Sequence, residues 1–343
     1  MSTAFAGYVA STIPSERFTF IDIGCSGGID PVWRLFGERL RVLAFDASVD
    51  ECERLAEAET HPDIHYIAGF VGISPDHPFA RRIGDKPRYE RNPFPRFCAG
   101  RMLEINRERL RSSPLEEKLR HNAWGMTKLA DPKIPVIVPS LLQEMGWSDI
   151  DFLKIDIDGP DYDVMNSFDG YFNPLKLLAA RLEVNLYGGI DDTHHTFHNM
   201  DRFMRARGFE LSGLDVRTYA MSAMPSPFAI TAPAQNVTGR PYQAEAFYIR
   251  DPAAPEQTDA AIELGPEKLA KLAAILSVWG QPDGAAEILL KFRAELMAIF
   301  DVDLGLELLA GQAQAAAATA LPYLDYIAAF EAGEPRFYPP LNS

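Results

Sequence analysis

Residues 18–48 read FTFIDIGCSGGIDPVWRLFGERLRVLAFDAS, and this stretch decides the fold. A short apolar run (18–23) leads into a glycine-rich turn, a segment of helical length follows, and a second apolar run (41–45) ends at Asp46. Glycines let the backbone turn tightly and approach a ligand without a Cβ in the way. An acid at the end of the second strand can accept hydrogen bonds from a ribose. The pattern strand, glycine turn, helix, strand, acid predicts a βαβ nucleotide-binding unit.

The spacing of the turn indicates the class of nucleotide. A dinucleotide fingerprint needs G-x-G-x-x-G, and Ser26 stands where its second glycine would be. The pattern Asp22-x-Gly24-x-Ser26-x-Gly28 instead resembles motif I of class I S-adenosylmethionine (SAM) methyltransferases, D-x-G-x-G-x-G. That resemblance implies that the turn packs against the methionine part of SAM and that Asp46 holds the ribose. The alternative is a tight turn in an α/β sheet that binds no ligand.

Composition limits the remaining choices. The chain has 343 residues, is 47% hydrophobic and carries a formal net charge of −15, so a nucleic-acid or anionic-membrane surface is not expected. Its three cysteines are odd in number and widely spaced, which fits neither a disulfide framework nor a cysteine zinc site. The first residues lack a basic leader, and no uninterrupted apolar segment reaches about 18 residues. We therefore expect a cytoplasmic protein without a membrane span.

Five more apolar runs follow the βαβ unit and complete a sheet. They lie at 64–73, 150–157, 177–186, 209–214 and 244–250. A seventh strand that enters as an antiparallel hairpin is typical of the methyltransferase sheet, whereas a six-stranded dehydrogenase sheet would not need it. At the end of the third strand Phe70 replaces the frequent acid, so adenine recognition would be mainly apolar. The residues expected at the cofactor are Asp22, Gly24, Cys25, Ser26, Gly28, Asp46 and Phe70.

A second motif narrows the resemblance to one family. Residues 138–165 read VPSLLQEMGWSDIDFLKIDIDGPDYDVM, and LEVN follows at 182–185. Together with DIGCSGGIDP, these stretches resemble the FkbM-type SAM-dependent methyltransferases over roughly residues 18–250. In this chain Asp158 replaces the family's usual Glu, and Asp161 stands where Glu is frequent. The resemblance implies a Rossmann-like α/β fold with a seven-stranded sheet, and methyl transfer to a hydroxyl of a small molecule, a sugar or a glycan precursor.

The carboxyl ends of strands one, four and five bound the crevice in such a sheet. We expect Asp156, Asp158, Glu183 and Asn185 to lie close together there. In one interpretation, Asp156 or Asp158 orients the acceptor hydroxyl and takes its proton. In the other, Asp156, Glu183 and Asn185 hold Mg²⁺, which lowers the pKa of the acceptor.

Three histidines follow the fifth strand. A single histidine from this loop, with His194 as the candidate, could act as general base. The plainer interpretation pairs a loop histidine with Asp191 or Asp192. His194 and His198 have i, i+4 spacing, but no HExxH glutamate or cysteine accompanies them, so zinc is not favoured. Lys154 lies inside a buried strand and needs a structural partner.

Two regions lie outside the core of the resemblance. An Arg-rich insertion at about 74–133 could grip an anionic substrate, but a solvated helical face with paired arginines is the favoured interpretation. Residues 253–343 predict an α-helical appendage with two amphipathic helices joined at 280–284. It would pack on the catalytic domain, form a homodimer contact or dock a partner protein. The expected domains are thus 1–252 and 253–343.

The sequence therefore favours a SAM-dependent O-methyltransferase. A non-catalytic SAM-fold protein that binds a partner through its helical tail is the alternative. An NAD-linked oxidoreductase is disfavoured by Ser26 and by the final hairpin.

Overall fold

The chain folds into two compact units. The computed structural model describes residues 4–13, 17–86, 91, 128–157, 159–172, 177–219, 239–254, 258–315 and 323–332. Most of the Arg-rich segment, with Cys98, lies outside these residues. One unit combines the described residues of Met1–Phe18, Asp30–Leu40 and Asp251–Ser343, and the other those of Thr19–Ile29 and Arg41–Arg250.

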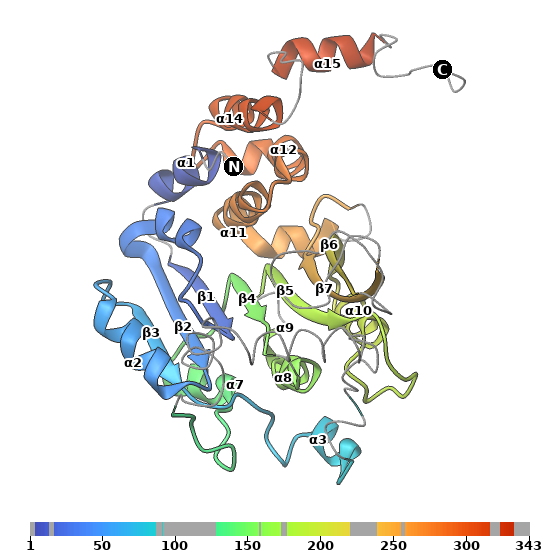
Figure 1. Ribbon diagram of the computed structural model, residues 1–343. Coiled ribbons are helices and arrows are strands. Elements are labelled where there is room, and N and C mark those ends of the chain that lie inside the picture. Colours follow the sequence, from blue (N-terminus) through green and yellow to red (C-terminus); the bar gives the residue numbers. More distant parts are fainter. Residues whose placement is uncertain are drawn as a thin grey trace, which may run out of the picture. The chain divides into compact units, whose positions relative to one another are not determined.

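The larger unit is built on a seven-stranded sheet in the order β3-β2-β1-β4-β5-β7-β6 (Figure 1). The strands are β1 (Phe18–Ile23), β2 (Leu40–Asp46), β3 (Ile64–Ala68), β4 (Phe152–Ile155), β5 (Ala179–Asn185), β6 (Glu210–Tyr219) and β7 (Arg240–Ile249). β4 is parallel to β1 and β5, whereas β7 is antiparallel to both β5 and β6. The predicted seven-stranded sheet with an antiparallel last strand is therefore confirmed.

Some strand bounds differ from the prediction for local reasons. β6 and β7 are longer than expected because they continue to pair as a hairpin as far as Tyr219 and Arg240. β3 is shorter and ends at Ala68. Just beyond it, a Cβ on Gly69 would come within 2.5 Å of Val136 Cγ2, so the chain passes closely there without forming a ladder. A further short apolar run at 134–138 forms only an isolated bridge, between Val71 and Val136.

The central strands are buried on both faces, and alternating residues of β1 and β4 place one large apolar cluster on one of them. Ile21 and Ile23 of β1, and Leu153 and Ile155 of β4, are fully buried in one apolar cluster. The helices that add buried apolar side chains to this cluster are α3 (Pro78–Ile83), α7 (Val138–Glu144), α8 (Asp161–Ser167), α9 (Asp169–Phe172) and α10 (Phe197–Arg205). The helix α2 (Val49–Ala58) joins β2 to β3. This packing fixes the carboxyl ends of the parallel strands, where the expected site lies.

The smaller unit is helical. Its elements are α1 (Ala4–Thr12), η1 (Pro31–Arg39), α11 (Thr258–Val278), α12 (Pro282–Lys291), α13 (Arg293–Leu296), α14 (Val302–Ala315) and α15 (Tyr323–Glu331). The predicted helical appendage is present. The domain boundary expected near residue 252 does not describe the N-terminal part, because α1 and η1 group with the C-terminal helices. Phe5 of α1 contacts Phe300 edge to face, with ring centroids 6.5 Å apart. None of the described helices is long and apolar enough to cross a membrane.

The segment after the glycine turn is a 3₁₀ helix and not the expected longer α-helix. Its first turn contains Pro31, and the Asp30 side chain accepts a hydrogen bond from Val32 N at 2.9 Å. Gly37, with φ 54° and ψ −136°, interrupts it. Phe36 stacks on Phe18 with ring centroids 3.9 Å apart. The element is thus fixed by aromatic packing more than by helical hydrogen bonding.

Two glycines of the turn provide a matched test of how closely the end of β1 approaches the end of β4. Gly24 has φ +97°, and a Cβ there would lie 1.8 Å from the carbonyl oxygen of Asp156, so its neighbour is backbone and cannot yield. Gly27 has φ +83° but open space around it. We expect Gly27→Ala to lower the free energy of unfolding by about 1–2 kcal/mol, and Gly24→Ala by more than about 4 kcal/mol. Urea unfolding of both variants measures the difference, and equal losses would contradict the close approach of β1 to β4.

Candidate active site

The glycine turn is held at the end of β1 by backbone hydrogen bonds. The N–H groups of Gly24 and Cys25 both donate to Phe45 O, at 2.9 and 3.0 Å, and Gly28 N donates to Cys25 O at 2.8 Å. Ser26 is exposed, and Cys25 is a buried free thiol. The turn therefore joins the ends of β1 and β2.

Asp46 ends β2 and is half-buried. Its Oδ1 accepts a hydrogen bond from Ser48 N at 2.8 Å, and Ser48 in turn caps α2 by accepting from Glu51 N at 3.2 Å. Glu51 Oε1 accepts from Gly27 N at 3.0 Å. The Arg54 side chain and Gly27 N–H hold the pKa of Glu51 below its usual value, despite partial burial. The turn, the acid and the start of α2 thus form one hydrogen-bonded unit.

The 128–136 segment, which begins in the last part of the Arg-rich insertion, borders the ends of β2 and β3. Ala130 N donates to Ala47 O at 2.9 Å, and Val136 N donates to Phe70 O at 2.8 Å. Phe70, the residue expected at the adenine, is half-buried beside it. Sequence reasoning missed this arrangement, because nothing in the pattern of residues 128–136 specifies two edge contacts.

Asp22 and Lys154 form a buried pair between β1 and β4. Lys154 Nζ lies 3.0 Å from Asp22 Oδ1 and donates to Gly24 O at 2.7 Å. The structural partner predicted for Lys154 is confirmed. Burial raises the pKa of Asp22 to about 6, and the Lys154 ammonium partly offsets this rise. Burial lowers the pKa of Lys154, but the carboxylates of Asp22 and Asp156 outweigh it and raise the pKa overall. Asp22 thus contacts the turn through Lys154.

Charged side chains continue across the same face of the sheet. Glu183 Oε1 accepts from Arg217 Nη1 at 3.4 Å and from Gln243 Nε2 at 3.1 Å. Arg217 also pairs with Glu245, which lies 3.1 Å from Arg181 Nε. Burial raises the pKa of Glu245, helped by the Asp156 charge and opposed by its arginine partners. Each of these carboxylates therefore already has a cationic partner.

The predicted metal ligands do not form a cluster among the described residues. Glu183 pairs with Arg217, and Asn185 Nδ2 donates to His195 O at 3.3 Å. Asp156 is half-buried at the end of β4, and its N–H donates to Ile23 O at 2.9 Å. In the described part of the chain, no group of three or more His, Cys, Asp or Glu side chains could hold a metal ion. The magnesium hypothesis gains no support there, and Asp158 lies outside the described residues.

The adjacent histidines of the loop after β5 differ in their surroundings. His194, the predicted base, is half-buried against Gly189, and its Nδ1 is buried without a hydrogen-bond partner. A loop histidine was expected to pair with Asp191 or Asp192, but both carboxylates have other partners. Asp191 binds Lys86 at 2.9 Å, and Asp192 binds Arg82 at 3.2 Å.

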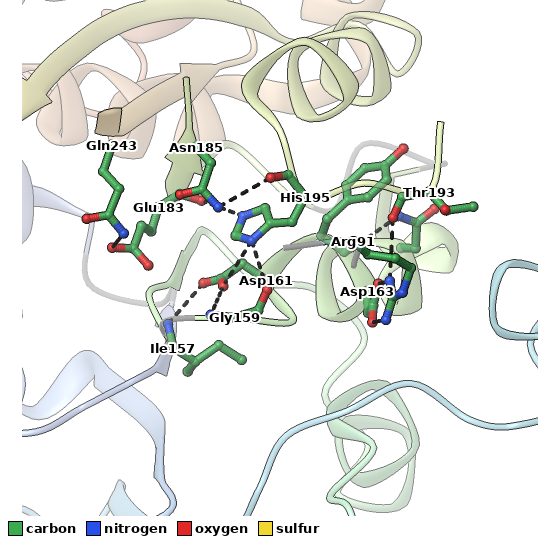
Figure 2. A network of polar contacts seen from close by, with 12 residues as sticks. Arg91, Ile157, Gly159, Asp161, Asp163, Glu183, Asn185, Thr193, His195 and Gln243 are labelled. Atoms are coloured by element: carbon green, nitrogen blue, oxygen red, sulfur yellow. Dashed lines mark hydrogen bonds and ion pairs between the residues drawn. The ribbon is translucent and has the colours of Figure 1, made fainter. Parts of the chain in front are cut away.

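His195 is the histidine at the centre of a buried network. Its ring nitrogens lie 2.8 Å from Gly159 O and 3.2 Å from Glu183 O (Figure 2). Sequence reasoning did not single it out, because two neighbouring histidines in a polar loop are equivalent until their burial is known.

The fold and the site can now be compared with those of known proteins. The sheet order and the glycine turn beside Asp46 define a class I methyltransferase fold. Residues 114–211 match the model of the methyltransferase FkbM domain. In this part of the sequence the chain is thus similar to FkbM methyltransferases. A search of curated proteins found no match.

A comparison with solved structures finds similarity to several methyltransferases, of which three are described here. A TehB-like SAM-dependent methyltransferase from Corynebacterium glutamicum is 9% identical, with a TM-score of 0.27 over 72% of this chain and 87% of that chain. A chain from Listeria monocytogenes, described as a SAM-dependent methyltransferase, is 11% identical, with a TM-score of 0.31 over 73% and 99%. A precorrin-6y C5,15-methyltransferase from Geobacter metallireducens is 9% identical, with a TM-score of 0.28 over 71% and 86%.

The raised pKa of Asp22 predicts a pH dependence of stability. A carboxyl whose pKa is higher in the folded state binds its proton more tightly there, so its contribution is greatest below its unfolded pKa and is lost as the pH rises through the folded value. With values of 3.8 and about 6, the loss amounts to about 3 kcal/mol between about pH 4 and pH 7. Asp22→Asn keeps an oxygen acceptor for Lys154 but cannot ionise. Urea unfolding across this range should show the stability of the wild type falling relative to Asp22→Asn; a constant difference would contradict the assignment.

Proposed function

We propose that this protein transfers a methyl group from SAM to a hydroxyl of a small molecule, most specifically a sugar or glycan precursor. The observation that carries the proposal is the hydrogen-bonded unit of glycine turn and acid at the ends of β1 and β2, in a chain whose residues 114–211 match the methyltransferase FkbM domain. The hydroxyl acceptor rests on the resemblance of the sequence to that family.

The residues present fit the cofactor. Gly24, Gly27 and Gly28 all have positive φ, and because they have no Cβ a ligand can approach their turn closely. One oxygen of Asp46 accepts from Ser48 N–H, and a carboxylate has further acceptor sites for the two hydroxyls of a ribose. Phe70 offers an apolar surface at the end of β3, as adenine recognition requires. We propose these residues as the cofactor site.

Bound SAM would supply an activated methyl group on a good leaving group. The work left to the protein is to align the acceptor and remove its proton. We propose Asp156 for this task; the support is that it is half-buried just after β4 and that its backbone carbonyl lies against the glycine turn. Asp158 follows two residues later and remains a second candidate from the sequence. His194, with an unpartnered Nδ1, is the third.

Two expectations stay predictions. One is a cytoplasmic location, and the other is that the C-terminal helices form a homodimer contact or dock a partner protein.

Calorimetric titration with S-adenosylhomocysteine tests the proposed cofactor site. Asp46→Asn keeps an oxygen for Ser48 N–H but removes the charge that would hold the ribose. We expect micromolar affinity in the wild type and a loss of about 10- to 100-fold in Asp46→Asn, the cost of a charge-assisted hydrogen bond. Asp50→Asn is the matched control. Asp50 lies nearby in the first turn of α2, is exposed and accepts a hydrogen bond from Lys128 N at 2.9 Å.

The control should bind like the wild type, and NAD should not bind to any of the three proteins. Equal weakening by both substitutions would remove Asp46 from the site. A folded wild type that binds neither nucleotide would overturn the proposed function. If S-adenosylhomocysteine binds, a panel of methyl glycosides with radiolabelled SAM tests the acceptor class.

A further inference from the structure

The loop at residues 157–159 follows β4 beside the glycine turn. Its first and last residues are both hydrogen-bonded to one carboxylate. Asp161 is fully buried, and its two oxygens accept hydrogen bonds from Ile157 N and Gly159 N, both at 2.9 Å. These two N–H groups flank residue 158. A carboxylate that accepts a hydrogen bond from both fixes the positions of these two N–H groups relative to each other.

His195 holds the same loop from the other side. Its imidazole is 3% exposed, its Nδ1 lies 2.8 Å from Gly159 O, and its Nε2 lies 3.2 Å from Glu183 O on β5. The ring therefore connects the end of β4 to the end of β5, and it also lies 3.7 Å from Asp161 Oδ2. Figure 2 shows the ring between these carbonyl groups and the Asp161 carboxylate.

The backbone of His195 is itself fixed by a buried ion pair. His195 N donates to Arg91 O at 3.0 Å. The Arg91 guanidinium makes two hydrogen bonds to Asp163, at 2.7 and 2.8 Å, and one to Thr193 O at 3.4 Å. A bidentate arginine–carboxylate pair with little solvent exposure allows few alternative geometries.

We propose that Asp161 and His195 are positioning residues that fix the 157–159 loop for methyl transfer. Both side chains are too buried to touch an acceptor, yet every hydrogen bond that they make to this loop ends on its backbone. They act on the reaction through the backbone of the loop, which begins next to Asp156. The inference rests on the proposed function, because it assigns the loop a role in that reaction.

Two amide variants of His195 separate its two contacts. An asparagine amide nitrogen corresponds in position to Nδ1, so His195→Asn retains an N–H group that can donate to Gly159 O. A glutamine amide nitrogen corresponds to Nε2, so His195→Gln retains an N–H group near Glu183 O and loses the contact with the loop. We expect His195→Gln to raise hydrogen exchange at Ile157 and Gly159 and to lower kcat, each by about tenfold, for a hydrogen bond of ordinary strength. His195→Asn should stay within about threefold of the wild type in both measurements.

A variant that lowers stability far from the loop is the control for a general loss of stability. Ser277→Ala removes a buried 2.6 Å hydrogen bond to Gln312 in the other unit, so it lowers stability without touching the loop. It should leave both loop exchange and kcat unchanged. All variants should bind S-adenosylhomocysteine within about twofold of the wild type, because the glycine turn is intact.

The inference is overturned if the two His195 variants behave alike, or if His195→Asn is the weaker of the two. Should neither variant fold, exchange in the wild type decides: protection of Ile157 and Gly159 up to global unfolding supports the network, and rapid exchange overturns it. A wild type that binds no S-adenosylhomocysteine defeats the proposed function instead, and the exchange data then still show whether the network holds the loop.

Discussion

The close approach of the glycine turn to the end of β4 is the constraint on which the site depends. The backbone of Gly24 packs so tightly on the Asp156 carbonyl that no side chain fits between them, and Lys154 reinforces the junction by binding Asp22 and Gly24 O together. A buried charge pair of this kind is costly to desolvate, and its partners must be well matched to persist. In this structure the pair fixes the spacing between the ends of β1 and β4.

Much of the fold could be predicted because its signals are local. The glycine spacing, the alternation of apolar residues and the KIDIDG run each depend on a few neighbouring positions, and they identified the sheet and its antiparallel last strand. The helix after the glycine turn was mistaken because Pro31, Gly37 and the stacking of Phe36 on Phe18 override its helical length. The grouping of α1 with the C-terminal helices was not predictable either, since it depends on contacts between distant residues.

The candidate site was predicted less completely, for a related reason. Residue type places Asp46 and Asp156 at strand ends, but it does not say which partner a carboxylate will find. Glu183 lies at a strand end, as a metal ligand would, yet its carboxylate forms an ion pair with Arg217 of β6. His194 and His195 are chemically identical in the sequence, and only the fold makes one of them a buried connection between two strands. Such distinctions arise from tertiary contacts, and a single sequence does not encode them in any short pattern.

The make-up of the helical unit has a consequence for how the chain is made. Tyr8 of α1 and Asp301 bind each other across 293 residues of sequence, and Phe5 likewise packs on Phe300. During synthesis, the apolar side of α1 is therefore translated long before the helices that cover it, while the whole sheet is produced in between. Contacts of such long sequence separation form late and slowly. The nascent chain therefore carries the apolar residues of α1 without their C-terminal partners through most of its translation, and such exposed apolar segments favour aggregation.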